Sequence, residues 1–95
     1  MGQYRITAQA RRDLLTIWRH IALDNEPAAD RQLDRFHETF RLLASQPMMG
    51  EDRGALRTRL RALGCGSYVV YYEPIKKDVR IVRVIHGARD VSRLF

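Results

Sequence analysis

The spacing of the apolar residues changes once along the chain, and this change limits the folds that the chain can adopt. Before residue 46 the apolar residues recur every three or four positions, which is typical of amphipathic helices. After residue 54 they occupy every second or nearly every position, which is typical of strands. Because 95 residues support only one hydrophobic core, we expect a single α+β domain over residues 1–95.

The first half predicts a short strand and two helices. Tyr4-Arg5-Ile6 alternates as a strand does, and Thr7 suits the N-cap of a helix over residues 8–23. Pro27 suits the first turn of a second helix, which should run to about Ser45. Because few residues join the two helices, we expect an antiparallel hairpin that packs against a sheet.

The second half follows a linker over 46–54 and predicts three strands. We expect these strands over residues 56–63, 68–72 and 79–85, with turns at 64–67 and 73–78. The last two strands are apolar at nearly every position, so they should be central. The predicted order is β-α-α-β-β-β, with the N-terminal strand and the helical hairpin on one face of a small antiparallel sheet.

Positive charge is concentrated in the second half. The net charge is +6, and residues 47–95 contain ten Lys or Arg against five acids, which gives +5. Fifteen of the 17 basic residues are arginine, the side chain best suited to bidentate recognition of carboxylate and phosphate. An acidic partner follows, either nucleic acid or an acidic protein surface, and a merely well-solvated basic surface is the alternative.

Three arginines are predicted to form one stripe. Residues two apart in a strand point the same way, so Arg57, Arg59 and Arg61 should share a face, with Arg83 on a neighbouring strand. Such a stripe could bind an RNA backbone or an acidic protein partner. Cutting RNA without a metal also requires a base and an acid, and arginine supplies only the cation.

The last eleven residues, 85–95, leave the most apolar strand and form a candidate working surface. His86 and Arg89 could belong to an active site, but the chain ends in Phe95, which cannot exchange a proton. We expect Gly87 to let the backbone leave the strand. The apolar residues of this tail should pack against the sheet; they are Val91, Leu94 and Phe95.

Several classes of site are excluded by spacing. The three histidines do not lie at metal-ligand spacing, and neither a nucleophile-elbow nor a phosphate-loop motif is present. The lone Cys65 cannot form an internal disulfide. We therefore expect no metal and no cofactor. Because no apolar run is long enough to span a membrane and the first residues do not resemble a signal peptide, we expect a cytoplasmic protein.

The whole chain resembles the ParE/RelE superfamily of toxins from type II toxin-antitoxin systems. The resemblance rests on the order of elements, the strand 68–72 and the ending Arg83-Val84-Ile85-His86-Gly87-Ala88-Arg89-Asp90. A strand followed by His-Gly-Ala-Arg-Asp and a short apolar finish is similar to the ParE branch, the plasmid-stabilisation toxins. That resemblance implies inhibition of DNA gyrase and replication without enzymatic activity, and no catalytic residue is assigned.

The RelE branch, which cuts messenger RNA on the ribosome, is the alternative. Arg59 or Arg61 and Arg89 could fill two roles of a RelE-like nuclease. However, Val69 stands where that branch has an arginine, and Phe95 stands near its terminal proton donor. A non-toxic remnant that only binds its partner is the third interpretation.

The resemblance also implies a ParD-like antitoxin, which would contact operator DNA on behalf of the complex. We expect this antitoxin to offer an acidic and apolar segment to the basic half of the chain. The residues predicted to bind it are Arg57, Arg59, Arg61, Arg83 and Arg89. The residues predicted to bind the target are His86, Arg89, Asp90, Arg93 and Phe95.

Overall fold

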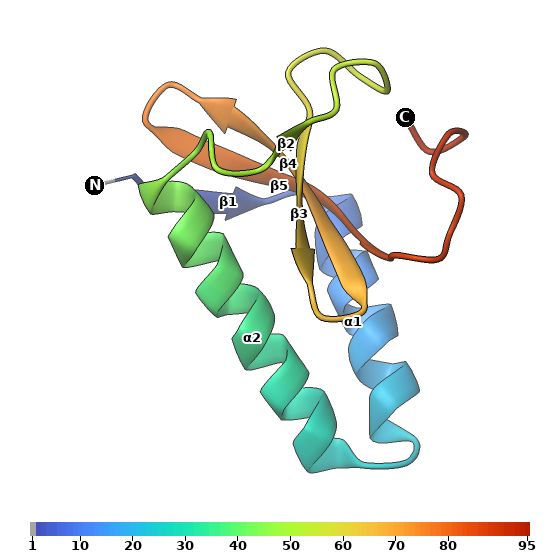
Figure 1. Cartoon of the computed structure of the whole chain (residues 1–95). Coiled ribbons are helices and arrows are strands. Elements are labelled where there is room, and N and C mark those ends of the chain that lie inside the picture. Colours follow the sequence, from blue (N-terminus) through green and yellow to red (C-terminus); the bar gives the residue numbers. More distant parts are fainter. Residues whose placement is uncertain (1) are drawn as a thin grey trace.

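A computed structural model describes residues 2–95 and contains two helices on one face of a five-stranded sheet (Figure 1). In chain order the elements are β1 (Tyr4–Ile6), α1 (Ala8–Ala22), α2 (Glu26–Ser45), β2 (Glu51–Asp52), β3 (Arg61–Cys65), β4 (Tyr68–Ile75) and β5 (Asp78–His86). The strand order across the sheet is β1-β5-β4-β3-β2. The α+β prediction is confirmed, but the sheet is mixed because β1 runs parallel to β5.

Both helices begin at the side chains that cap their free amides. Thr7 accepts a hydrogen bond from the amide of Ala10 at 3.0 Å, and its hydroxyl also donates to the carbonyl of Val82 at 3.1 Å. The Asn25 side chain accepts a hydrogen bond at 3.0 Å from the amide of Ala28, the residue that follows Pro27. The predicted N-cap of α1 is therefore confirmed, and Thr7 also fixes the start of α1 against β5.

The first apolar cluster fills the space between the helices and the sheet. The aromatic rings of Phe36 and Phe40 on α2 are buried there against Tyr72 of β4 and Ile81 of β5. The predicted apolar face of the second helix is therefore the one that is buried. Without the sheet each helix would expose its apolar face to water, so the hairpin depends on the sheet for its stability.

A second apolar cluster lies on the opposite face of the sheet. Tyr71 of β4 and Ile85 of β5 form its floor, and the C-terminal tail covers them through Val91, Leu94 and Phe95. In Figure 1 this tail, drawn in red, returns beside the sheet on the side away from α2. The predicted packing of the tail against the sheet is confirmed.

The strand predicted over 56–63 is confirmed only for residues 61–63, and its first part is wrong. Residues 54–59 form turns and a bend, and β3 begins only at Arg61. Arg59 adopts a left-handed backbone with φ of 69°, which directs the chain so that Leu60 is buried in the second apolar cluster. Burial of Leu60 therefore replaces the regular alternation that the sequence pattern suggested.

The strands near the two turns are longer than predicted. Strand β3 includes Cys65, so the turn predicted at 64–67 is reduced to Gly66 and Ser67, with Gly66 at φ of 60°. Strand β4 continues to Ile75, and the turn predicted at 73–78 is reduced to Lys76 and Lys77. Within the predicted linker, the short strand β2 pairs with β3, a pairing that the sequence did not predict.

Candidate functional site

The structure separates the three arginines that were predicted to share one strand face. Arg57 and Arg59 lie in the turns before β3, and Arg61 alone lies in a strand. Arg61 donates through Nε to the carbonyl of Gly50 at 3.0 Å and through Nη2 to that of Met48 at 3.1 Å. The predicted stripe is therefore wrong, because Arg61 holds the 46–54 segment in place while Arg59 stays exposed.

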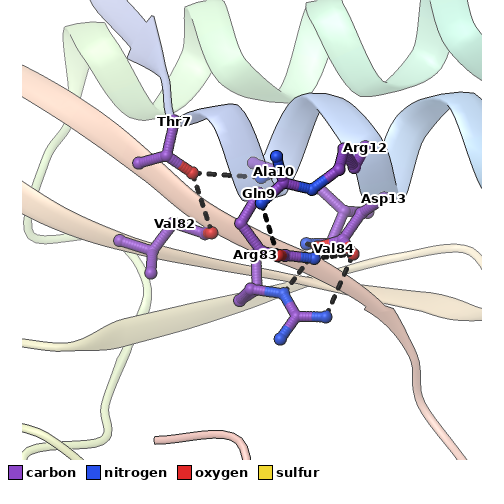
Figure 2. Close-up of polar contacts among 8 residues, drawn as sticks. All are labelled: Thr7, Gln9, Ala10, Arg12, Asp13, Val82, Arg83 and Val84. Atoms are coloured by element: carbon purple, nitrogen blue, oxygen red, sulfur yellow. Dashed lines mark hydrogen bonds and ion pairs between the residues drawn. The ribbon is translucent and has the colours of Figure 1, made fainter.

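Arg83 forms an ion pair with Asp13 that links β5 to α1 (Figure 2). Its Nε and Nη2 donate to the two carboxylate oxygens at 2.8 and 3.0 Å, and the amide of Val84 donates to the same carboxylate at 3.0 Å. Both side chains are less than 15% exposed, at 14% and 11%. Arg83 lies opposite Tyr71 in the β4-β5 register, next to a register shift between Tyr71 and Tyr72.

A row of charges crosses the face of the sheet that the helices leave open. We use the name arginine row for Arg5, Arg80 and Arg57 together with Glu73. Arg5 lies opposite Arg80 in the β1-β5 register, and Arg80 lies opposite Glu73 in the β4-β5 register. The Glu73 carboxylate binds Arg80 through one oxygen and Arg57 through the other, the latter at 3.4 Å. The sequence analysis assigned no role to Arg80. Its neighbours Val79 and Ile81 are buried against the helices. Because side chains alternate along a strand, the Arg80 side chain must point to the opposite, open face.

A groove runs beside this row and extends to the C-terminal tail. We call it the sheet groove; it is lined by Thr7, Gln9, Arg57, Arg80, Val82, Arg83, Leu94 and Phe95. It brings together two of the arginines predicted to bind the antitoxin, Arg57 and Arg83, with one predicted target-binding residue, Phe95. Arg59, Arg61 and Arg89 do not line it.

The tail displays its polar residues and buries its apolar ones. His86, Arg89, Asp90 and Arg93 are exposed, whereas Phe95 packs its ring against Tyr71 with centroids 5.1 Å apart. A hydrogen bond from the Ser92 amide, assisted by its side chain, holds the pKa of Asp90 below that of an ordinary aspartate. Gly87 donates its amide to the Ser67 carbonyl at 2.8 Å, so its lack of a side chain serves this close approach rather than a left-handed turn.

A second cleft lies between α1 and the end of β5. It gathers His20, Tyr68, His86 and Arg89 around the Asp13–Arg83 pair. The rings of Tyr68 and His86 meet edge to face with centroids 5.5 Å apart, and Nδ1 of His86 accepts from the Ala88 amide at 3.1 Å. This cleft therefore places three side chains that can exchange protons beside two guanidinium groups.

Groups of acidic, histidine or cysteine side chains that could hold a metal ion are absent from the described residues 2–95. None of the helices in this part of the chain is long and apolar enough to cross a membrane.

A family model described as the ParE toxin of the type II toxin-antitoxin system parDE matches residues 4–91, from β1 to the tail. The chain belongs to the ParE toxin family. A curated relative, Toxin ParE3 of Caulobacter vibrioides, is 30% identical over 93 residues, which cover 97% of this chain and 93% of that protein. The recognised ParE resemblance is thereby confirmed.

The fold of this ParE-family chain also matches a solved structure described as the chromosomal ParDE TA system from P. aeruginosa. The TM-score is 0.75, with 90% of this chain and 96% of that chain covered. The two sequences are 20% identical, so this likeness concerns the fold alone. In this chain the sheet groove is lined by residues of both the C-terminal tail and the arginine row.

Proposed function

We propose that this ParE-family toxin inhibits DNA gyrase and is held inactive by a ParD-like antitoxin. The observation that carries the proposal is the family match over residues 4–91, which includes the strand 68–72 and the His-Gly-Ala-Arg-Asp run at 86–90. The exposed residues His86, Arg89, Asp90 and Arg93 offer a polar surface for the target. Gyrase acts on DNA in the cytoplasm, which is the compartment expected from the sequence.

We further propose that inhibition is not enzymatic. The two positions at which a RelE-like nuclease has an arginine and a proton donor are Val69 and Phe95. Both side chains pack against the second apolar cluster, and neither can exchange a proton. Loss of a proton-transfer group typically lowers a rate by about 10²- to 10⁴-fold, which supports binding rather than catalysis.

Ribosome-dependent cleavage of messenger RNA is the second candidate, because the cleft at the end of β5 favours it. Tyr68, His20 and His86 there could exchange protons, and Arg89 could stabilise negative charge on a phosphate. The Tyr68 side chain gives a specific test, since Tyr68→Phe removes the hydroxyl and keeps the ring that packs against Phe36 and His86.

One experiment compares the two activities. The purified toxin is added to gyrase in a supercoiling assay and to ribosomes carrying messenger RNA. Loss of supercoiling with intact messenger RNA is the expected result, and Tyr68→Phe should inhibit gyrase as the wild type does. Cleaved messenger RNA that becomes intact with Tyr68→Phe would establish the nuclease instead. If the protein neither inhibits gyrase nor cleaves messenger RNA but still binds the antitoxin, it is a non-toxic partner-binding protein.

A further inference from the structure

The cleft between α1 and the end of β5, which we call the β5 cleft, contains one carboxylate among its lining residues in the described chain. This carboxylate, Asp13, accepts from Nε and Nη2 of Arg83 at 2.8 and 3.0 Å. The Val84 amide at 3.0 Å and Nε2 of Gln9 at 3.4 Å donate to it as well. Because a carboxylate has about four acceptor sites, Asp13 has none left for a ligand and serves to hold Arg83 in place.

Two guanidinium groups line the same cleft and keep donors available. Nη1 of Arg83 has no hydrogen-bond partner within residues 2–95, and in Figure 2 it points away from the Asp13 carboxylate. Arg89 is exposed and forms no ion pair in the described part of the chain. Since Asp13 balances the charge of Arg83, Arg89 gives the cleft a net positive charge.

The backbone determines which nitrogen of His86 carries a proton. The amide of Ala88 donates to Nδ1 at 3.1 Å, and a nitrogen that accepts a hydrogen bond carries no proton. In the neutral ring the proton is therefore on Nε2. The edge-to-face contact with Tyr68, with centroids 5.5 Å apart, supports the ring. Nε2 of His86 is thus a hydrogen-bond donor at the cleft before any ligand arrives.

These donors favour a phosphate group as the ligand. Arg89, Nη1 of Arg83 and Nε2 of His86 belong to three separate side chains, and all of them donate. The oxygens of a phosphate are arranged tetrahedrally and can accept from several directions at once, whereas the oxygens of a carboxylate lie in one plane. Guanidinium groups also pair strongly with phosphate because both partners are charged.

The aromatic contacts of the cleft favour a duplex over a single strand. Proteins that bind single strands stack the bases on aromatic side chains. The Tyr68 ring already contacts Phe36 and His86 edge to face, with centroids 5.4 and 5.5 Å apart. The exposed residues of the cleft are polar or charged, and such residues suit the phosphates on the outside of a duplex.

We propose that the β5 cleft binds a backbone phosphate of duplex DNA through Arg89, His86 and Arg83. This inference rests on the proposed function, because it takes the DNA on which gyrase acts as part of the target. It also fits inhibition without catalysis. DNA lacks the 2′-hydroxyl of RNA, so the side chains of the cleft that exchange protons have no nucleophile within the strand to activate.

The test measures binding of the purified toxin to a short labelled DNA duplex by fluorescence anisotropy at several salt concentrations. Arg89→Ala with His86→Ala removes two exposed donors of the cleft. Arg31→Ala is the control, because it removes the same charge from an exposed residue of α2 that forms no ion pair within residues 2–95. We expect the cleft variant to bind about tenfold more weakly than wild type, with a smaller salt dependence, and the control less than about twofold more weakly.

A second comparison tests the role of Nε2 of His86. His86→Gln places an amide donor close to the position of Nε2, whereas His86→Ala has no donor there. We expect His86→Gln to keep most of the affinity for the duplex and His86→Ala to lose it. Equal affinities of these two variants would overturn the role assigned to His86. Circular dichroism verifies folding, and Arg89→Ala alone replaces the double variant if that variant does not fold.

The other outcomes separate the sources of the phosphate and the two proposals. Equal affinity of the cleft variant and Arg31→Ala would overturn this inference and leave the proposed function intact. If NMR showed that inorganic phosphate shifts the His86 ring but the toxin did not bind the duplex, the ligand would be a free phosphate compound and not DNA. Tighter binding of a single-stranded RNA of the same length, lost in the cleft variant, would overturn the duplex in favour of RNA. Wild-type toxin that bound the duplex but did not inhibit supercoiling would contradict the proposed function alone.

Discussion

At the scale of single residues, the Asp13 side chain connects α1 to β5. It receives hydrogen bonds from Arg83 through two nitrogens and from the amide of Val84. Replacing Asp13 with alanine leaves the Arg83 charge largely buried without a partner. We expect the free energy of unfolding to fall by about 3 kcal/mol, measured by urea denaturation.

The exposed Asp34 on α2 provides the control for this change. It makes no ion pair within residues 2–95, so Asp34→Ala should alter stability by less than about 0.5 kcal/mol. In a double-mutant cycle with Arg83→Ala, the loss from Asp13→Ala should shrink, because the unpaired charge is then absent. Additive losses in that cycle would contradict an energetic coupling between the two residues.

Gly50 is a second residue with a specific structural requirement. Its amide donates to the Tyr72 hydroxyl at 2.8 Å, and a side-chain carbon at this position would stand 2.5 Å from that oxygen and 2.8 Å from the Ala62 carbonyl. We predict that Gly50→Ala lowers the thermal midpoint strongly, with a loss of about 2–3 kcal/mol from overpacking and the broken hydrogen bond. Gly64→Ala is the matched control, since nothing lies within 4 Å of its added carbon, and it should be neutral or slightly stabilising.

At the scale of elements, local spacing predicts the helices and the central strands but not the segment before β3. In α2, β4 and β5 the spacing of the apolar residues in the sequence is enough to predict which side chains are buried. Leu56 to Leu63 alternates like a strand, yet Leu60 is buried after the left-handed Arg59, and only residues from Arg61 onward form the strand. The predicted arginine stripe failed with this strand, because the direction of each arginine depends on the backbone of that segment.

The features that arrange the candidate site also differ in whether local sequence can predict them. Asp13 and Arg83 are 70 residues apart, and nothing in a single sequence indicates that they meet. The position of Arg80 on the open face could be read from alternation in the strand predicted over 79–85. Its partner Glu73 could not, because that residue was predicted to lie in a turn and instead extends β4.

The C-terminal tail is an element attached mainly by its apolar side chains. From Ala88 onward its backbone hydrogen bonds within residues 2–95 are local, and Val91, Leu94 and Phe95 hold it to the sheet. Removing residues 89–95 would therefore expose the second apolar cluster as well as delete the polar surface. A test of the target-binding prediction has to keep these three anchors.

We predict that Arg89→Ala with Arg93→Ala abolishes gyrase inhibition while the protein stays folded. Both arginines are exposed, and neither forms an ion pair in the described part of the chain, so stability should change by less than about 0.5 kcal/mol for each. Supercoiling assays measure inhibition, and urea denaturation measures stability. Full inhibition by this stable double variant would show that the target surface lies elsewhere.

At the scale of the whole molecule, one sheet is enclosed by two apolar clusters, and the antitoxin should bind only when both are formed. Arg57 and Arg83, two of the arginines predicted to bind the antitoxin, come from different elements and lie together only in the folded chain. A ligand that binds only the folded state raises the free energy of unfolding by about 2.7 kcal/mol at 100 times its dissociation constant. We therefore predict that antitoxin at this concentration raises the urea midpoint of the isotopically labelled toxin, followed by NMR, by about 1–2 M. A midpoint that does not move, at antitoxin concentrations that saturate binding in calorimetry, would mean that the antitoxin also binds unfolded chains and does not require the folded toxin.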